Sequence, residues 1–252
     1  MPLAMPLKNA ANSLYDAALA LLYPQPCAIC SASVESNADG VACAACWQKT
    51  RLFSGAETVC WKCGAPAGGS VPEDKREGVR CGRCETEEFT AARACGVYEG
   101  ALRASILALK REPHVAARLV QLMLEALGRA PLEHVTSILP VPLHPERERE
   151  RGFNQAALLG RALAARSGLR LDEWSLRRSL QTERHRTGMD ARARRESVAQ
   201  AFVVQRPRLI QGQSILLVDD VFTTGATVSS CAAALKLAGA LEVLVLTLAR
   251  PI

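Results

Sequence analysis

The segment from Gln213 to Thr227 constrains the fold more than any other part of the chain. It reads Q-S-I-L-L-V-D-D-V-F-T-T-G-A-T, and its apolar run Ser214 to Val218 is typical of a strand buried on both faces of a parallel sheet. Asp219 and Asp220 follow at the carboxyl end of that strand, where open α/β sheets bind their ligands. The sequence therefore predicts an α/β domain with a mostly parallel sheet and a ligand site at this strand end.

A hydroxyl-rich turn follows the acid pair and leads into a predicted helix. Backbone N–H groups, hydroxyl groups and a helix N-terminus can converge on one anion there, so the turn suits a phosphate. The residues concerned are Thr223, Thr224, Gly225, Ala226 and Thr227. The P-loop pattern is absent because no Gly-Lys-Ser/Thr follows the strand, and receiver-type metal sites lack the T-T-G-x-T turn. Carboxylates beside a phosphate site favour a ligand with a diol at one end and a phosphate at the other, such as ribose 5-phosphate.

This motif resembles the 5-phosphoribosyl-1-pyrophosphate (PRPP) site of type I phosphoribosyltransferases. The resemblance implies that Asp219 and Asp220 hold the ribose 2′- and 3′-hydroxyls, and that the turn from Thr223 to Thr227 holds the 5′-phosphate. It also implies that Mg²⁺ accompanies PRPP in the site.

Eight of the ten cysteines form four C-x-x-C pairs in the first third of the chain. Two such pairs complete the tetrahedron that zinc prefers, so four pairs predict two structural zinc ions. The predicted ligands are Cys27, Cys30, Cys43, Cys46, Cys60, Cys63, Cys81 and Cys84. Sequential pairing is the simplest arrangement, and the spacing is also compatible with an interleaved one. No signal peptide is evident, which favours metal over disulfides and a cytoplasmic location.

Composition and hydrophobic spacing divide the chain into three segments. Residues 1–24 are predicted to form an amphipathic lead-in helix, residues 25–90 the double zinc ribbon, and residues 91–252 the α/β domain. Within the last segment the patterns predict helices over 102–110, 115–127 and 156–166, strands over 95–98 and 137–141, and a loop over 140–155. No apolar run is long enough to span a membrane, so no membrane insertion is expected.

Arginines are concentrated between Arg147 and Arg195, where thirteen arginines accompany six acidic residues. A concentrated basic region indicates a polyanionic partner, either pyrophosphate or nucleic acid. Arg147 and Arg151 follow a predicted strand and are candidates for stabilising a departing pyrophosphate, with a solvated charged turn as the alternative. The candidate contacts for single-stranded DNA are Arg184, Arg186, Arg192, Arg194 and Arg195.

Taken together, the motifs resemble the ComF (competence protein F, GntX-like) family over nearly the whole chain. The shared features are the double zinc ribbon, the L-A-L-K segment ending at Lys110, the P-V-P-L-H and R-G-F-N-Q loop, V-D-D-V-F-T-T-G-A-T, and the closing L-T-L-A-R that ends at Arg250. The chain departs from the family pattern at Asp190, where Gln is usual, and at Ser197, where Asn is usual. These positions lie in the segment that corresponds to the loop closing over pyrophosphate.

The resemblance implies a type I phosphoribosyltransferase-like domain behind the ribbon and a role in DNA uptake during natural transformation. Two functions remain open at this stage. One is transfer of phosphoribosyl to an acceptor that the sequence does not name. The other is a non-catalytic protein that senses PRPP and binds single-stranded DNA, a competence helicase or DNA-processing proteins.

Overall fold

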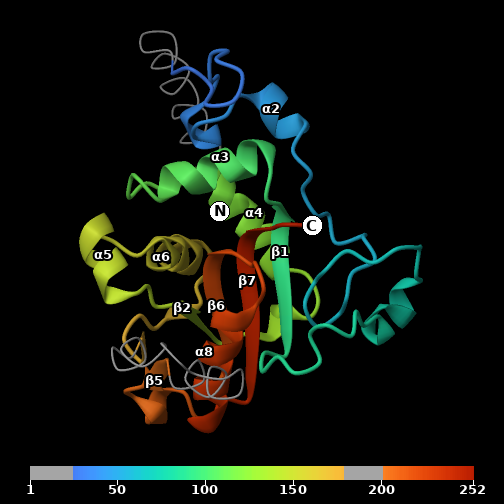
Figure 1. Cartoon of the computed structure of the whole chain (residues 1–252), viewed down its shortest axis with the longest axis vertical. Coiled ribbons are helices and arrows are strands. Elements are labelled where there is room, and N and C mark those ends of the chain that lie inside the picture. The colour runs from blue at the N-terminus through green and yellow to red at the C-terminus, as the bar shows by residue number, and fades with distance from the viewer. Residues whose placement is uncertain (1–24, 179–200) are drawn as a thin grey trace, which may run out of the picture.

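The computed structural model describes residues 25–178 and 201–252 (Figure 1). The predicted lead-in helix over 1–24 lies outside these described residues. So do the five arginines predicted to contact nucleic acid, Arg184, Arg186, Arg192, Arg194 and Arg195.

A five-stranded parallel sheet forms the centre of the molecule, with the strand order β1-β7-β6-β2-β3. Its strands are β1 Ala91–Val97, β2 Ser137–Pro140, β3 Arg170–Leu171, β6 Ser214–Val221 and β7 Glu242–Arg250. A separate antiparallel pair consists of β4 Leu176–Arg178 and β5 Phe202–Val204. The prediction of an α/β fold with a mostly parallel sheet and an N-terminal double ribbon is confirmed.

Helices cover both faces of this sheet, and the central strand contributes to a separate core on each face. In β6, Leu216 and Val218 belong to one core, whereas Ile215 and Leu217 belong to the other. This alternation is what a strand buried on both faces requires. The first core includes residues of α3 Gly100–Leu109, α4 Ala117–Leu127 and α6 Gln155–Ser167, and the second includes residues of α8 Ala226–Leu237.

The ribbon contributes cysteines to both of these cores. Cys27 and Cys43 pack in the core of α3, α4 and α6, while Cys60 and Cys63 pack in the core of α8. In Figure 1 the first half of the ribbon, with α2 Ala44–Gln48, lies beside α3, and the second half lies beside β1. The two halves of the ribbon are therefore joined to opposite faces of the sheet.

The segment between the two halves of the ribbon covers the free side of β1, which is an edge strand of the sheet. Phe53 N donates to Cys95 O at 2.8 Å, and Val97 N donates to Arg51 O at 2.9 Å. An uncovered strand edge presents unpaired N–H and C=O groups to other chains. The ribbon thus completes the hydrogen bonding of the sheet edge.

Short 3₁₀ helices connect several of these elements. They are η1 Asn37–Asp39, η2 Glu73–Gly78, η3 Leu132–His134 and η4 Pro207–Leu209.

Three sequence predictions differ from the structure in their bounds. Strand β6 continues past the acid pair because Val221 pairs with Ala249 of β7, so the two acids lie within the last three residues of the strand. Strand β1 begins at Ala91 rather than at 95, because its first residues pair with β7. The predicted loop over 140–155 contains the helix α5 Pro145–Arg151.

Local sequence explains this unpredicted helix. Pro145 occupies the first turn, where its fixed φ suits a helix and its missing N–H is not needed. The His144 ring nitrogen caps the helix by accepting from Glu146 N at 3.3 Å. Gly152 ends it in the left-handed conformation, at a φ of 79°. Alternating Glu and Arg gave no apolar stripe from which the helix could be recognised.

Candidate functional site

The acid pair lies at the end of β6, where a lysine that was not predicted as a site residue approaches it. Asp220 is 6% exposed, and its Oδ2 lies 2.7 Å from the Nζ of Lys110, which follows α3. This contact is an ion pair rather than a well-directed hydrogen bond. Asp219 is half-buried, and its Oδ1 accepts from Asp220 N at 2.9 Å.

The environment of Asp219 disfavours its charged form. Burial raises the pKa of its carboxyl well above the usual range, and the neighbouring Asp220 charge raises that pKa further. Lys110 acts in the opposite direction and lowers the pKa of Asp219. Ionising both acids would therefore place more negative charge at the strand end than one lysine offsets, and a metal ion or sugar hydroxyl donors would stabilise that charged form.

The turn after β6 has the geometry of an anion site. Gly225 has a φ of 88°, and a Cβ at this position would lie 2.9 Å from the Phe222 ring, so only glycine fits without strain. Helix α8 begins at the next residue, and Thr224 Oγ1 accepts from Ala226 N at 3.4 Å. The exposed hydroxyls of Thr223, Thr224 and Thr227 thus surround the positive end of a twelve-residue helix.

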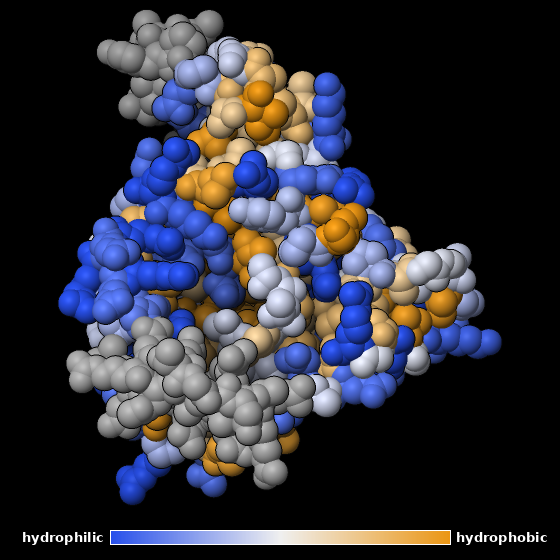
Figure 2. Space-filling view, viewed as in Figure 1, coloured by the Kyte–Doolittle hydropathy of each residue, from blue (hydrophilic) through white to orange (hydrophobic). Residues whose placement is uncertain are grey.

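The arginine-bearing helix α5 follows the carboxyl end of β2, next to the carboxyl end of β6. Its chain leaves β2 beside the end of β6, because Val141 N donates to Val218 O at 2.9 Å. Figure 2 shows hydrophilic residues gathered over the position of α5. Arg151 donates to Gln155 Oε1, whereas Arg147 is exposed and has no ion pair within the described part of the chain. Pyrophosphate stabilisation by Arg147 and Arg151 stays a prediction.

The eight predicted zinc ligands form two clusters, each with its four Sγ atoms within 4.8 Å of one another. One cluster contains Cys27, Cys30, Cys43 and Cys46, and the other contains Cys60, Cys63, Cys81 and Cys84. The pairing is therefore sequential, and the interleaved alternative does not occur.

The separations between the sulfur atoms fit zinc. Cys27 and Cys46 are 3.7 Å apart, and Cys60 and Cys84 are 3.6 Å apart. Four ligands at about 2.3 Å from a tetrahedral zinc are separated by about 3.8 Å, whereas a disulfide requires about 2.0 Å. With four thiolates and no open position, each cluster fits a structural zinc ion rather than a catalytic one.

The half-buried Arg93 and the buried Arg250 connect the second cluster to the sheet. Arg93 Nη1 donates to Trp61 O at 2.8 Å, and Arg250 Nη1 donates to Cys63 O. Burial lowers the pKa of Arg93 to about 10, and the charges of Cys60 and Cys63 oppose this shift. The two arginines therefore place positive charge beside a cluster that would carry net negative charge with zinc bound to its four thiolates.

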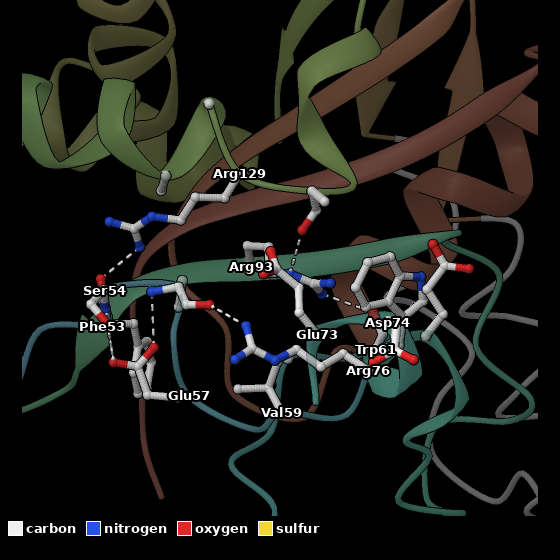
Figure 3. A pocket seen from close by; sticks show the side chains of 17 residues that line it. Phe53, Ser54, Glu57, Val59, Trp61, Glu73, Asp74, Arg76, Arg93 and Arg129 are labelled. Atoms are coloured by element: carbon white, nitrogen blue, oxygen red, sulfur yellow. Dashed lines mark hydrogen bonds between the residues drawn. The ribbon is translucent and has the colours of Figure 1, made fainter. Parts of the chain in front are cut away.

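A cavity of about 490 Å³ lies between the ribbon, β1 and the end of α4, and its lining includes neither Asp219 nor Asp220 nor any residue of the turn from Thr223 to Thr227. Figure 3 shows the guanidinium groups that border it donating to backbone carbonyls. Arg76 bonds Gly55 O at 3.1 Å, and Arg129 bonds Phe53 O at 2.6 Å. The Arg129 bond joins the domain to the ribbon, and the Arg76 bond holds two parts of the ribbon together, so this cavity lies at the contact between the ribbon and the domain.

Lys110 and Arg250 are charged residues that sequence reasoning did not assign to the site. Both end apolar segments that were recognised as family motifs, L-A-L-K and L-T-L-A-R. The sequence signal that could have identified them is a charged residue directly after an apolar run, at the end of a strand or helix. Their partners, Asp220 and the Cys63 carbonyl, are distant in sequence.

The two clusters predict the metal content of the protein. Reduced, purified protein is expected to contain two zinc ions per chain by elemental analysis. A Cys95→Ala variant should keep both ions, because Cys95 is buried outside either cluster. A content of one zinc or none in intact wild-type protein would contradict the assignment.

Known proteins match this chain in both of its parts. Residues 18–85 match the double zinc ribbon domain. The DNA utilization protein YhgH of Salmonella typhi is 32% identical over 240 residues, which cover 91% of this chain and 99% of that protein. Competence protein F of Haemophilus influenzae is 34% identical over 118 residues, covering 45% of this chain and 50% of that protein.

A solved structure, glutamine PRPP amidotransferase from B. subtilis complexed with ADP and GMP, shows a partial likeness. Its TM-score is 0.35 at 17% identity, and the match covers 58% of this chain and 26% of the amidotransferase chain. Separately, none of the helices within 25–178 and 201–252 combines the length and apolar character needed to cross a bilayer.

Proposed function

Because this chain belongs to the YhgH/ComF family, in which a double zinc ribbon precedes a phosphoribosyltransferase-like domain, we propose that it binds PRPP and acts in DNA utilisation. The observation that carries the proposal is that an acid pair and a hydroxyl-rich turn follow one another at the carboxyl end of β6. Asp219 and Asp220 end β6, and the turn that begins α8 follows at once.

The chemistry of the two halves matches the two ends of a phosphorylated ribose. Carboxylates accept hydrogen bonds from a sugar diol, and such charge-assisted bonds are stronger than neutral ones. Threonine hydroxyls and the N–H groups that open α8 donate to a phosphate. The side chain of Ala226 has no polar group, so its possible contribution is its backbone N–H, which donates to Thr224 Oγ1 at 3.4 Å.

Mg²⁺ fits this site as an ion carried by the ligand. Magnesium is usually held by one or two carboxylates together with substrate phosphates and water. Asp219 and Asp220 supply two carboxylates, and the described residues form no cluster of three or more possible ligands apart from the cysteine groups. When bound, the ion would neutralise pyrophosphate charge, while Lys110 sits where it can balance the acids in the absence of ligand.

Two finer forms of the function follow from this site. In the catalytic form, Arg147 and Arg151 stabilise departing pyrophosphate while an acceptor takes the phosphoribosyl group. In the non-catalytic form, the domain senses PRPP and the arginine-rich segment binds single-stranded DNA or a DNA-processing partner. Release of pyrophosphate from PRPP in the presence of candidate bases distinguishes the two.

The test of the proposed site is calorimetric titration of PRPP with and without Mg²⁺. Asp220→Asn removes a charged acceptor at constant volume, so binding should weaken by roughly 1.5–3 kcal/mol, or about 10- to 150-fold. Asp39→Asn is the matched control, because Asp39 is also a carboxylate in an ion pair, with Arg118, but lies in the ribbon. No PRPP binding by wild-type protein from micromolar to millimolar concentrations would refute the proposal.

A further inference from the structure

A second cavity, of about 440 Å³, separates the second cysteine cluster from the phosphate-type turn. Thr223 and Thr224 border it on one side, and Cys63 and Cys81 border it on the other. Its lining also includes Phe222, Arg83, Arg250 and the chain end at Ile252. The ribbon therefore supplies one wall of a cavity whose opposite wall is the turn itself.

Arg250 indicates that this cavity accepts a polar ligand. The residue is 8% exposed, and its Nε is buried without a hydrogen-bond partner among the described residues. Its Nη1 is used by the Cys63 carbonyl, and its guanidinium lies 5.3 Å from the Phe222 ring centre. A buried donor without a partner is costly, so an oxygen atom of a ligand would find favourable hydrogen bonding here.

The position of the cavity specifies which part of a ligand could occupy it. It borders the turn but neither the acid pair nor Lys110. With a sugar on the acids and its 5′-phosphate in the turn, a group in the cavity is attached on the far side of that phosphate. On the 5′ side of its ribose, PRPP ends at the phosphate, so PRPP alone leaves the cavity unfilled. A phosphodiester continues there into a second nucleoside.

We propose that this cavity binds the nucleoside that precedes a phosphate held in the turn, so that the site accepts the 3′-terminal dinucleotide of a single strand. The proposal rests on the proposed function, since it uses the same turn and acids, although a deoxyribose offers the acid pair its 3′-hydroxyl alone. It joins a PRPP-type site to DNA utilisation through one shared phosphate position.

The walls of the cavity suit a nucleobase. Aromatic rings and arginine guanidinium groups are the usual platforms for unpaired bases, and Phe222 and Arg250 lie together here. Arg83 is exposed at the cavity and offers a positive charge to the next phosphate of a longer strand. Glu87 also borders the cavity and favours donors on the base over further anionic groups.

The experiment uses two diester probes of equal charge on the zinc-loaded full chain. Thymidylyl-(3′→5′)-thymidine has a nucleoside beyond its phosphate, whereas thymidine 5′-(methyl phosphate) has only a methyl group. The dinucleotide should bind at least about fivefold more tightly, which is the lower bound for stacking of one base. It should also be displaced by PRPP, because both ligands need the turn.

Two variants localise the effect. Ile252→Trp places a bulky ring at the cavity from the exposed chain end and should reduce dinucleotide binding to the level of the methyl ester, with PRPP binding unchanged. Arg83→Glu should weaken binding of longer single strands more than Arg80→Glu, because Arg80 is exposed on the same loop but does not border the cavity.

Equal binding of the two diesters by a protein that binds PRPP would overturn the inference and leave the proposed function standing. Tighter dinucleotide binding that Ile252→Trp does not change would overturn it as well, since the nucleoside would lie elsewhere. Failure of PRPP and both diesters to bind would reject the proposed function and the inference together.

Discussion

Removal of zinc from the second cluster is expected to unfold the sheet domain together with the ribbon. Cys60 and Cys63 pack in the same core as α8 and β6, and the Cys63 carbonyl accepts from Arg250 of β7. Structural zinc contributes on the order of 10–16 kcal/mol of binding free energy, which is comparable to the roughly 5–15 kcal/mol that holds a whole domain folded. Loss of this metal should therefore remove a free energy as large as the whole free energy of unfolding of the domain, and the sheet should not stay folded.

Thermal melting of Cys60→Ser, followed by circular dichroism, measures this effect. The matched control is Cys231→Ser, since Cys231 is a fully buried cysteine of the same core that is not a zinc ligand. The control should lose a few kcal/mol at most, whereas Cys60→Ser should lose the cooperative transition. A normal sheet transition in Cys60→Ser would show that the ribbon folds as an independent unit.

Replacement of Asp219 by Asn is expected to stabilise the ligand-free protein while it weakens PRPP binding. Burial and Asp220 raise the pKa of Asp219, so the folded state holds this proton more tightly than the unfolded state does. The stabilisation from the protonated form is complete below the unfolded pKa of about 3.9 and is lost as pH rises through the raised folded pKa. Above the unfolded pKa the unfolded state loses this proton more readily than the folded state does, so Asp219 opposes folding near neutral pH.

Melting temperatures from pH 4 to pH 8 test this sign. Asp219→Asn should melt higher than wild type at neutral pH, by roughly 2–4 °C for each kcal/mol gained, and the advantage should shrink as pH falls. Asp172→Asn should do the opposite. Burial raises the pKa of Asp172, but hydrogen bonds from Ser175 and Trp174 lower it overall, so its carboxylate stabilises the fold at neutral pH. A lower melting temperature for Asp219→Asn at pH 7 would contradict the account.

The local features of the site could be predicted from the sequence because each depends on neighbours in the chain. Four C-x-x-C pairs define their own metal chemistry, and an apolar strand that runs into Asp-Asp and T-T-G-A-T places its polar groups by strand and helix geometry alone. The positive φ of Gly225 agrees with the glycine in that turn.

Features that depend on tertiary packing could not be predicted in this way. The ion pair of Lys110 with Asp220 joins residues on separate elements, and the ribbon's use of both sheet faces follows from β1 being the edge strand. Helix α5 was missed because its stability comes from end capping by His144, Pro145 and Gly152 rather than from an apolar stripe.

Hydrogen–deuterium exchange of the zinc-loaded protein, with and without PRPP and Mg²⁺, tests the central claim most directly. The account predicts slower exchange in peptides covering the end of β6, the turn and the start of α8, residues 219–228, with little change across the cavity near Arg93. The protection should be absent in Asp220→Asn at the same PRPP concentration. Saturating PRPP that leaves exchange over 219–228 unchanged, or protects only another region, would contradict it.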